Sequence, residues 1–438
     1  MKVSTQQRQI AELAQRHAGE GLNTLHTYLD VDWLREAYDR VRKDGAPGID
    51  GETWTSYGMK LEANLGDLLE RAKSGRYQAP PVKRVHIPKG NGKETRPIGI
   101  PTLEDKVLQR AVVMLLEPIF ELEFHGHSYG FRPGKSAHQA LGAVWDGCMN
   151  LGIQWLVDAD LRNYFDTIDR SLLRDMLRKR VRDGVIDRLV GKWLKAGVME
   201  EGQWMCPERG TPQGGVLSPL LSNLYLHEVL DEWMVNTVSA HLRGRWFIVR
   251  FADDYVLGLE RKDDAERLMK ALPKRFERFG LSLHPEKTRL IPFGRPAGVG
   301  GSETERPAPG SFDFLGFTHY WGRSRKGNWV VMRKTAKDRA NRGLKGISEW
   351  CKKHRHLNVR EQHRVLCRKL RGHDAYYGIT GNSRSLSRFH DAVKRIWRKW
   401  LNRRSRTPSL SWAEFMRLLR VLPLPPVRIV HSIYAAKP

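Results

Sequence analysis

Cysteine is scarce in this sequence. Only four cysteines occur in 438 residues, at Cys148, Cys206, Cys351 and Cys367, and their spacing fits neither a zinc site nor a disulfide framework. We therefore expect free thiols in a reducing compartment, and an intracellular, cytoplasmic protein, most simply a bacterial one.

Long apolar runs and a secretory leader are also missing. The apolar runs are much shorter than the roughly 20 residues that a membrane-spanning helix needs. The N-terminal stretch MKVSTQQRQIAELAQRH is polar and lacks the apolar core of a secretory signal. We expect neither a membrane protein nor a secreted one.

Acidic residues are few relative to basic ones. Lysine and arginine number 75 against 49 aspartates and glutamates, which gives a formal net charge of +26. A charge this large in a chain with an ordinary apolar fraction indicates a polyanionic partner, most simply nucleic acid. An anionic membrane surface is the weaker alternative.

The chain is long enough for two or three domains, each with its own core. Helical periodicity and the Gly/Pro loop DGAPGIDG mark residues 1–75. Strands and helices follow over 76–330, and a basic helical region over 331–438. This layout predicts an α+β fold with a helical appendage.

Two adjacent acids lie at the tip of a predicted hairpin. In RWFIVRFADDYVLGLE, Asp253 and Asp254 separate two apolar stretches typical of strands. Such a pair is most often an ordinary turn, but a third acid, Asp160, ends the strand-like stretch QWLVDADL. Three converging carboxylates are suited to holding two Mg²⁺ ions for chemistry on phosphate esters. Asp158 shares a face with Asp160 and Asp166 follows, so spacing alone does not choose between them.

Several motifs together resemble one family. DLRNYF, GTPQGGVLSPLLSNLYL, RFADDYVLG and LHPEKT occur in the order of the palm motifs of reverse transcriptases. IPKGNGKETRPIGIP, SYGFRPGKSAHQAL, FDFLGF and LRGHDAYYGITGNSRSLSRFHDAVKRIWRKWLNRRS resemble further blocks of the group II intron-encoded reverse transcriptases and maturases. The resemblance covers nearly the whole chain. It implies a right-hand polymerase fold: an RNA-contacting N-terminal extension over 1–75, fingers and palm with antiparallel sheet over 76–330, and an all-helical thumb or maturase (X) domain over 331–438.

The resemblance also implies which residues are catalytic. The family's motif aspartate lies five residues before an aromatic residue, which selects Asp160 over Asp158. Asp160, Asp253 and Asp254 then bind two Mg²⁺ ions, for which Mn²⁺ can substitute. Phe165 matches the aromatic residue beneath the sugar of the incoming nucleotide, where a ring excludes a 2′-hydroxyl. Without the motif, core packing would be the better interpretation of Phe165.

Further nucleotide contacts are implied in three places. Lys89 and Arg96 flank the turn KGNGKETR, which in the family contacts the incoming dNTP, and Lys93 could replace either. Alone, this stretch would be interpreted as a solvated basic turn. Gln213 of PQGG matches a residue beside the nucleotide pocket, and Lys287 of HPEKT matches a lysine near the leaving pyrophosphate.

Template and RNA contacts are expected from basic residues. GFRPGKSAH is not a nucleotide-binding phosphate loop, because Tyr129 stands where that loop needs glycine. Arg132 and Lys135 are therefore interpreted as contacts to template or nucleotide. In KRIWRKWLNRRSR, basic residues alternate with tryptophans, a composition that suits RNA even if the tryptophans pack inward. The candidate RNA-binding residues here are Lys394, Arg395, Arg398, Arg403 and Arg404.

The resemblance implies an RNA-directed DNA polymerase, a nucleotidyltransferase in which a DNA or RNA primer 3′-hydroxyl attacks the α-phosphate of a dNTP opposite an RNA template. We expect it to bind its group II intron RNA, to assist splicing and mobility, and to meet a DNA target site. Phe251 stands where the family more often has tyrosine, and we expect activity to survive the lost hydroxyl.

Two alternatives stay open. One is a splicing-only RNA-binding maturase, against which the intact aspartates argue. The other is a relative recruited to DNA repair or phage defence with the same chemistry. Many family members also carry a His-Asn-His endonuclease with cysteine pairs, which we do not expect here because no such cysteine spacing is present.

Overall fold

The computed structural model describes residues 2–88, 95–200, 202–205, 210, 214–296, 308–404 and 410–432. The chain forms two compact units. The first comprises Met1–Ala140, Val157–Leu257 and Arg261–Leu290, and the second Leu141–Leu156, Gly258–Glu260 and Ile291–Pro438. The expected division into segments 1–75, 76–330 and 331–438 stays a prediction.

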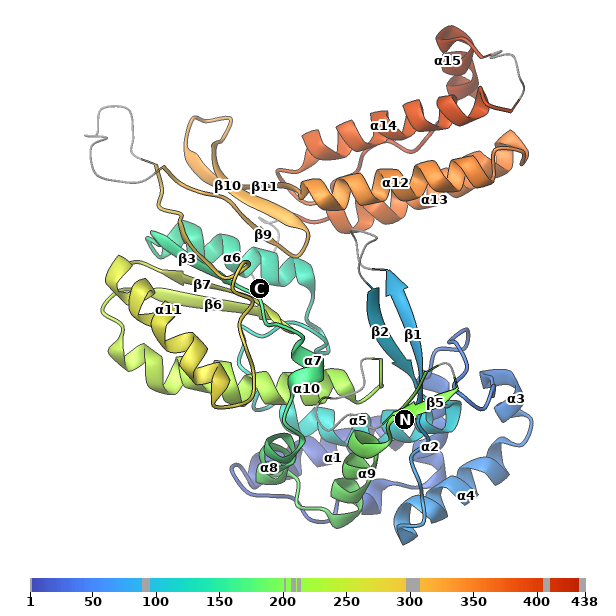
Figure 1. Ribbon diagram of the computed structural model, residues 1–438, viewed down its shortest axis with the longest axis vertical. Coiled ribbons are helices and arrows are strands. Elements are labelled where there is room, and N and C mark those ends of the chain that lie inside the picture. Colours follow the sequence, from blue (N-terminus) through green and yellow to red (C-terminus); the bar gives the residue numbers. More distant parts are fainter. Residues whose placement is uncertain are drawn as a thin grey trace. The chain divides into compact units, whose positions relative to one another are not determined.

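Helices open the first unit (Figure 1). They are α1 (Lys2–Arg16), α2 (Val31–Arg40), α3 (Trp54–Gly58) and α4 (Leu61–Ser74), with a 3-10 turn at Leu25–Tyr28. Both α1 and α2 pack against α5 (Leu103–Phe120), which is buried along most of its length. The Asp30 carboxylate caps α2 by accepting from Trp33 N. The Trp33 side chain is fully buried and its Nε1 donates to Ala111 O at 3.0 Å, which fixes α2 on α5.

A small mixed sheet follows in the order β2-β1-β4-β5. Its strands are β1 (Val82–Pro88), β2 (Thr95–Ile100), β4 (Val198–Glu200) and β5 (Gln203–Met205). Strands β1 and β2 are antiparallel, with Val85 opposite Ile98, whereas β1 and β4 are parallel. The turn that joins β1 to β2 lies outside the described residues.

The sheet that carries the acids has the order β6-β7-β3-β8. Its strands are β3 (Trp155–Ala159), β6 (Trp246–Phe251), β7 (Asp254–Leu259) and β8 (Arg289–Pro292). The helices that occur between these strands in the sequence are α7 (Tyr164–Thr167), α8 (Arg170–Arg180), α9 (Gly184–Lys195), α10 (Ser218–Leu226) and α11 (Lys262–Glu277). Helix α11 runs beside the sheet (Figure 1). The fully buried rings of Tyr255 and Phe276 join the two, with centroids 6.3 Å apart. This unit is α+β with antiparallel strands, as the sequence predicted.

The second unit combines a sheet with helices. It contains most of α6 (Ala137–Asn150), the antiparallel sheet β9 (Phe312–Phe314), β10 (Phe317–Arg323) and β11 (Trp329–Thr335), and helices α12 (Lys337–Lys353), α13 (Val359–Tyr377), α14 (Ser383–Leu401) and α15 (Trp412–Val421). Leu366, Val393, Trp397 and Phe415 lie in its helical core. The predicted helical C-terminal region is confirmed.

Two of the opening observations have structural counterparts. Among the described helices, none is long and apolar enough to cross a membrane. Cys148, Cys351 and Cys367 are free, buried thiols, and Cys206 lies outside the described residues.

Candidate active site

The two acids of the hairpin occupy a tight turn. Strand β6 ends at Phe251 and β7 begins at Asp254, so Ala252 and Asp253 form the connection. The Ala252 backbone has a positive φ of 57°, a conformation that is uncommon for a residue with a Cβ. Gly130 packs directly on this turn, because a Cβ at that position would clash with the Ala252 backbone nitrogen. The conformation of the turn is therefore held by its surroundings.

A buried arginine supports this turn from within the protein. Arg250 is completely buried and donates to the Asp231 carboxylate, with Nη2 and Oδ2 2.5 Å apart. Its Nη1 donates to Asn223 Oδ1 at 3.0 Å and to the Ala252 carbonyl oxygen at 3.1 Å. Burial alone would raise the pKa of Asp231, but Arg250 and His127 hold that pKa well below its ordinary value. The buried ion pair between Arg250 and Asp231 therefore fixes the backbone of the turn that carries Asp253.

Asp160 and Asp253 follow separate strands, and the charge of Asp160 acts on Asp253. Asp160 directly follows β3, which ends at Ala159. Burial raises the pKa of Asp253, and the negative charge of Asp160 raises it further, while Arg96 and Arg250 partly offset this. Two carboxylates that repel each other in a desolvated place are stabilised by a shared cation.

The neighbouring acid Asp158 is engaged elsewhere. Its Oδ2 lies 2.9 Å from Arg289 Nη2. The Oδ2 of Asp160 lies 2.7 Å from Lys287 Nζ, and this lysine remains largely exposed. The structure therefore brings Asp160, Asp253 and Lys287 together and couples Asp158 to an arginine. The donor set is all carboxylate oxygen, the ligand type that hard divalent cations prefer.

Two residues expected near the nucleotide lie in this unit with partly accessible side chains. Arg96 is an exposed residue of β2, and its charge reaches Asp253. Phe165 is half-buried in α7, with its ring edge-on to Tyr164 at a centroid separation of 5.3 Å. Tyr164 is buried and its hydroxyl donates to Ser222 O at 2.7 Å, which anchors α7. Lys89, Lys93 and Gln213, which were also expected near the nucleotide, lie outside the described residues.

Glycines in the loop before α10 make close backbone contacts within the protein. Gly210 has φ +88°, and a Cβ there would meet the Phe165 carbonyl oxygen at 2.8 Å. Gly214 has φ +107°, and a Cβ there would meet the Gly99 carbonyl oxygen on β2 at 2.5 Å. Only glycine accommodates both the backbone angle and the space, so Gly210 packs closely on α7 and Gly214 on β2.

The two basic residues of GFRPGK differ in accessibility. The Arg132 guanidinium is buried and donates to Glu121 and to three carbonyl oxygens, those of Phe124, His125 and Ser128. The geometry gives Arg132 a structural role in holding the loop after α5, and its contact with template stays a prediction. Lys135 is half-exposed with its ammonium 5.4 Å from the Tyr129 ring centroid.

The basic residues at the end of α14 and just beyond it lie in the second unit. Trp397 and Trp400 are buried, which is the inward packing that the sequence left open. Lys394 and Arg395 both bond Asp391. Arg398 donates to Leu410 O and lies over the Trp412 ring, and Arg403 lies over the Trp400 ring. Arg404 donates to the carbonyl oxygens of Arg355 and Leu357. Arg395, Arg403 and Arg404 are exposed, so their charge is available at the surface.

Sequence reasoning missed Asp231, Asn223 and Arg250. One available signal was Arg250 itself, a single charge inside the apolar run WFIVRFA. A buried charge requires a partner, but its identity as Asp231 depends on folding.

The sequence is similar to several known proteins. The family model for "Reverse transcriptase (RNA-dependent DNA polymerase)" matches residues 87–319. Protein YkfC of Escherichia coli is 37% identical over 289 residues, which cover 59% of this chain and 76% of that protein. The group II intron-encoded protein LtrA of Lactococcus lactis is 36% identical over 229 residues, covering 52% of this chain and 37% of LtrA. Nuclear intron maturase 2 of Arabidopsis thaliana is 31% identical over 180 residues, covering 32% of this chain and 24% of the maturase. The match therefore spans most of YkfC and well under half of LtrA and the maturase.

Proposed function

The chain belongs to the reverse transcriptase (RNA-dependent DNA polymerase) family, and on that premise we propose that it copies RNA into DNA at Asp160, Asp253 and Asp254 and binds a group II intron RNA to assist splicing and mobility. The observation that carries the proposal is the electrostatic effect of Asp160, at the end of β3, on Asp253 in the turn between β6 and β7, which Arg250 holds in place.

Reverse transcriptases use divalent metal ions, and the three aspartates are the residues that would hold them here. We propose Mg²⁺ as the natural ion, with Mn²⁺ as a substitute, because every ligand is a hard oxygen. When bound, two such ions make the attacking hydroxyl more nucleophilic and stabilise the charge on the leaving group. The chain's own part is to fix the carboxylates: β3 ends at Asp160, and Arg250 holds the turn that carries Asp253.

The remaining proposed contacts serve the incoming dNTP. Arg96, with Lys89 on the other side of the turn, binds the triphosphate, and Lys287 stands beside Asp160 where it neutralises charge on the departing pyrophosphate. Gln213 lies beside the nucleotide. Phe165, half-buried at the start of α7, stands under the sugar and rejects a 2′-hydroxyl by its bulk.

We further propose that the elements form a right-hand polymerase. The sheet β6-β7-β3-β8 corresponds to the palm, the β1–β2 hairpin to part of the fingers, and α12 to α15 to the thumb or maturase domain. Lys135 on the template side and the basic end of α14 then contact RNA, while the buried Arg132 holds its own loop. The positive charge supports these contacts, since the chain carries 75 basic against 49 acidic residues.

The function is tested by primer extension on an RNA template with Mg²⁺, using dNTPs or rNTPs. Wild type is expected to extend with dNTPs, and Asp253→Ala to be inactive while it binds RNA with unchanged affinity. Wild type that binds RNA tightly but never extends a primer would instead support a splicing-only maturase. Extension that persists in Asp253→Ala would refute the site.

A further inference from the structure

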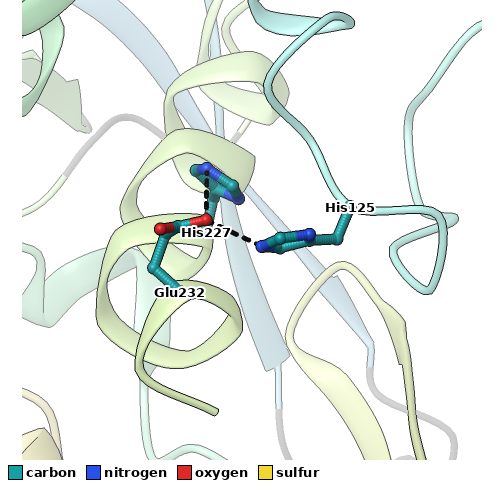
Figure 2. A group of neighbouring side chains, drawn as sticks. All are labelled: His125, His227 and Glu232. Carbon is teal, nitrogen blue, oxygen red and sulfur yellow. Dashed lines mark hydrogen bonds and ion pairs between the residues drawn. The ribbon is translucent and has the colours of Figure 1, made fainter. Parts of the chain in front are cut away.

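A second group of metal-ligating side chains lies away from the three aspartates, around His125, His227 and Glu232 (Figure 2). Glu232 Oε1 lies 2.7 Å from His125 Nε2 and 3.6 Å from His227 Nε2. All three ligand atoms lie within 4.8 Å of one another. Two ligands of a tetrahedral Zn²⁺, each about 2.1 Å from the ion, are separated by about 3.4 Å, so the measured distances bracket that value.

The backbone is distorted in a way that brings two of these residues together. His227–Asp231 and Met234–Val238 are π-helical segments that follow α10, and Glu232 N donates to His227 O across five residues. In a regular α-helix, residues five apart point about 140° away from each other. The wider π turn aligns the side chains of His227 and Glu232 instead. Such turns are rare and are frequent at functional sites.

Neighbouring groups orient the ligands as they do in known metal sites. Asp231 Oδ2 lies 3.9 Å from His227 Nδ1, the nitrogen that faces away from Glu232, which is an ion-pair distance and not a hydrogen bond. Asn236 Nδ2 donates to Glu232 Oε2 at 2.5 Å, leaving Oε1 toward the histidines. Arg132 donates to the carbonyl oxygen of His125 at 2.6 Å and so fixes the loop that carries this ligand. In known zinc sites a ligating carboxylate is tethered by hydrogen bonds, as Glu232 is here, and a carboxylate accepts from the far nitrogen of a ligating histidine; Asp231 lies on that side of His227 without a hydrogen bond to it.

The accessibility and donor chemistry of the ligands also suit a cation. The His227 ring is buried. His125 and Glu232 are partly exposed, which gives an ion a route from solvent. Two imidazoles and one carboxylate form a borderline-soft donor set, unlike the all-oxygen set of the three aspartates.

We propose that His125, His227 and Glu232 form a site for one divalent transition metal ion, with Zn²⁺ as the best match. The fourth position is open to water. Asp231 connects this site to the active site, because it contacts His227 on one side and holds Arg250 on the other. Bound metal therefore stabilises the π turn and, through Asp231 and Arg250, the turn that presents Asp253. The proposal rests on this geometry and not on the polymerase activity.

The test uses the full chain stripped with a chelator and then titrated with Zn²⁺ by calorimetry in saturating Mg²⁺, so that the aspartates are already engaged. One equivalent of Zn²⁺ should bind to wild type and raise its Tm by several degrees. His125→Ala and Glu232→Gln should lose that equivalent and that shift while keeping the metal-free Tm within a few degrees, since both side chains are partly exposed.

Two controls separate this site from other zinc-binding groups. Asp160→Asn changes the active site, and His241→Ala removes an exposed imidazole whose Nδ1 lies 2.9 Å from Thr237 O. Both should keep the zinc equivalent. The proposal is overturned if wild type binds no zinc at micromolar concentrations. It is equally overturned if His125→Ala and Glu232→Gln both bind like wild type, or if Asp160→Asn alone abolishes binding.

Discussion

Lys287 Nζ lies 2.7 Å from Asp160 Oδ2, so the lysine proposed to act on the leaving group is paired with a proposed metal ligand. The two residues are 127 positions apart in sequence and lie on neighbouring segments, since His284 N donates to Asp160 O at 2.8 Å. Any cation that binds Asp160 competes with this ammonium group. The pair therefore links metal affinity to the position of Lys287.

The variant Lys287→Met should separate the effect of this lysine on Mg²⁺ affinity from its effect on kcat. Removal of the competing charge should lower the half-saturating Mg²⁺ concentration about two- to five-fold, since an exposed pair is worth up to about 1 kcal/mol. Loss of the charge near the pyrophosphate should lower kcat by about 10²-fold. Steady-state extension across a Mg²⁺ titration measures both, and Lys270→Met, which changes an exposed lysine on α11, should alter neither. An unchanged kcat would remove Lys287 from the chemistry.

Asp253 should make the protein's stability depend on pH and on divalent ions. Its pKa is raised in the folded state, so the folded protein binds a proton more readily than the unfolded chain does, and stability falls as pH rises through the folded pKa. The amide of Asp253→Asn carries no ionisable proton, so this variant does not lose stability in that way as the pH rises. It should be more stable than wild type at pH 8, and the difference in stability should be smaller at pH 4. Mg²⁺ should raise the Tm of wild type at pH 8 more than that of the variant. Equal responses of both proteins to pH would show that Asp253 is not desolvated.

Arg250 is a positioning residue, because it touches the turn and not the substrate. Arg250→Lys loses the contacts to Asn223 Oδ1 and Ala252 O, which should lower the free energy of unfolding by roughly 3 kcal/mol. A loosened turn should lower kcat by about 10²-fold with little change in KM for dNTP. Urea unfolding and single-turnover extension check the two effects, with Arg261→Lys on the surface as the matched substitution. A stable variant with wild-type kcat would contradict the role given to this network.

Phe165 should set the choice between dNTP and rNTP. Phe165→Val removes the ring that stands edge-on to Tyr164 and leaves the buried tyrosine in place. Incorporation of rNTP relative to dNTP should rise about 10- to 100-fold, the range that a steric contact in a pocket supplies. Competition between the two nucleotides on one template measures the ratio. A ratio that does not change would leave Phe165 as a packing residue.

The local parts of the site could be predicted from sequence because they are encoded locally. The apolar run before Asp160 predicts a strand end, and β3 does end at Ala159. The break in apolar pattern at Asp253 predicts a turn, and the strands stop on either side of it. The order of the motifs adds the family, which the family model confirms over residues 87–319.

The remaining contacts depend on where distant segments meet. The residue type of Arg132 predicts a contact at the protein surface, but its guanidinium group donates instead to carbonyl oxygens of the preceding loop. His125 and His227 are 102 positions apart, so no spacing in the sequence relates them. The π turn that aligns His227 with Glu232 could not be predicted either, because no residue pattern in the sequence marks a π-helical segment.

The account is tested most directly by comparing Asp160→Asn with Asp158→Asn in primer extension on RNA with Mg²⁺. The two acids lie two residues apart at the end of β3, but Asp160 acts on Asp253 whereas Asp158 pairs with Arg289. Loss of one metal ligand removes several kcal/mol of transition-state stabilisation, so Asp160→Asn should reduce the extension rate by about 10³-fold or more. Asp158→Asn should stay within about ten-fold of wild type, because its loss costs one partly exposed ion pair. A larger loss of extension rate in Asp158→Asn than in Asp160→Asn, or an equal loss of rate in both variants, would contradict the assignment of Asp160 to the metal site.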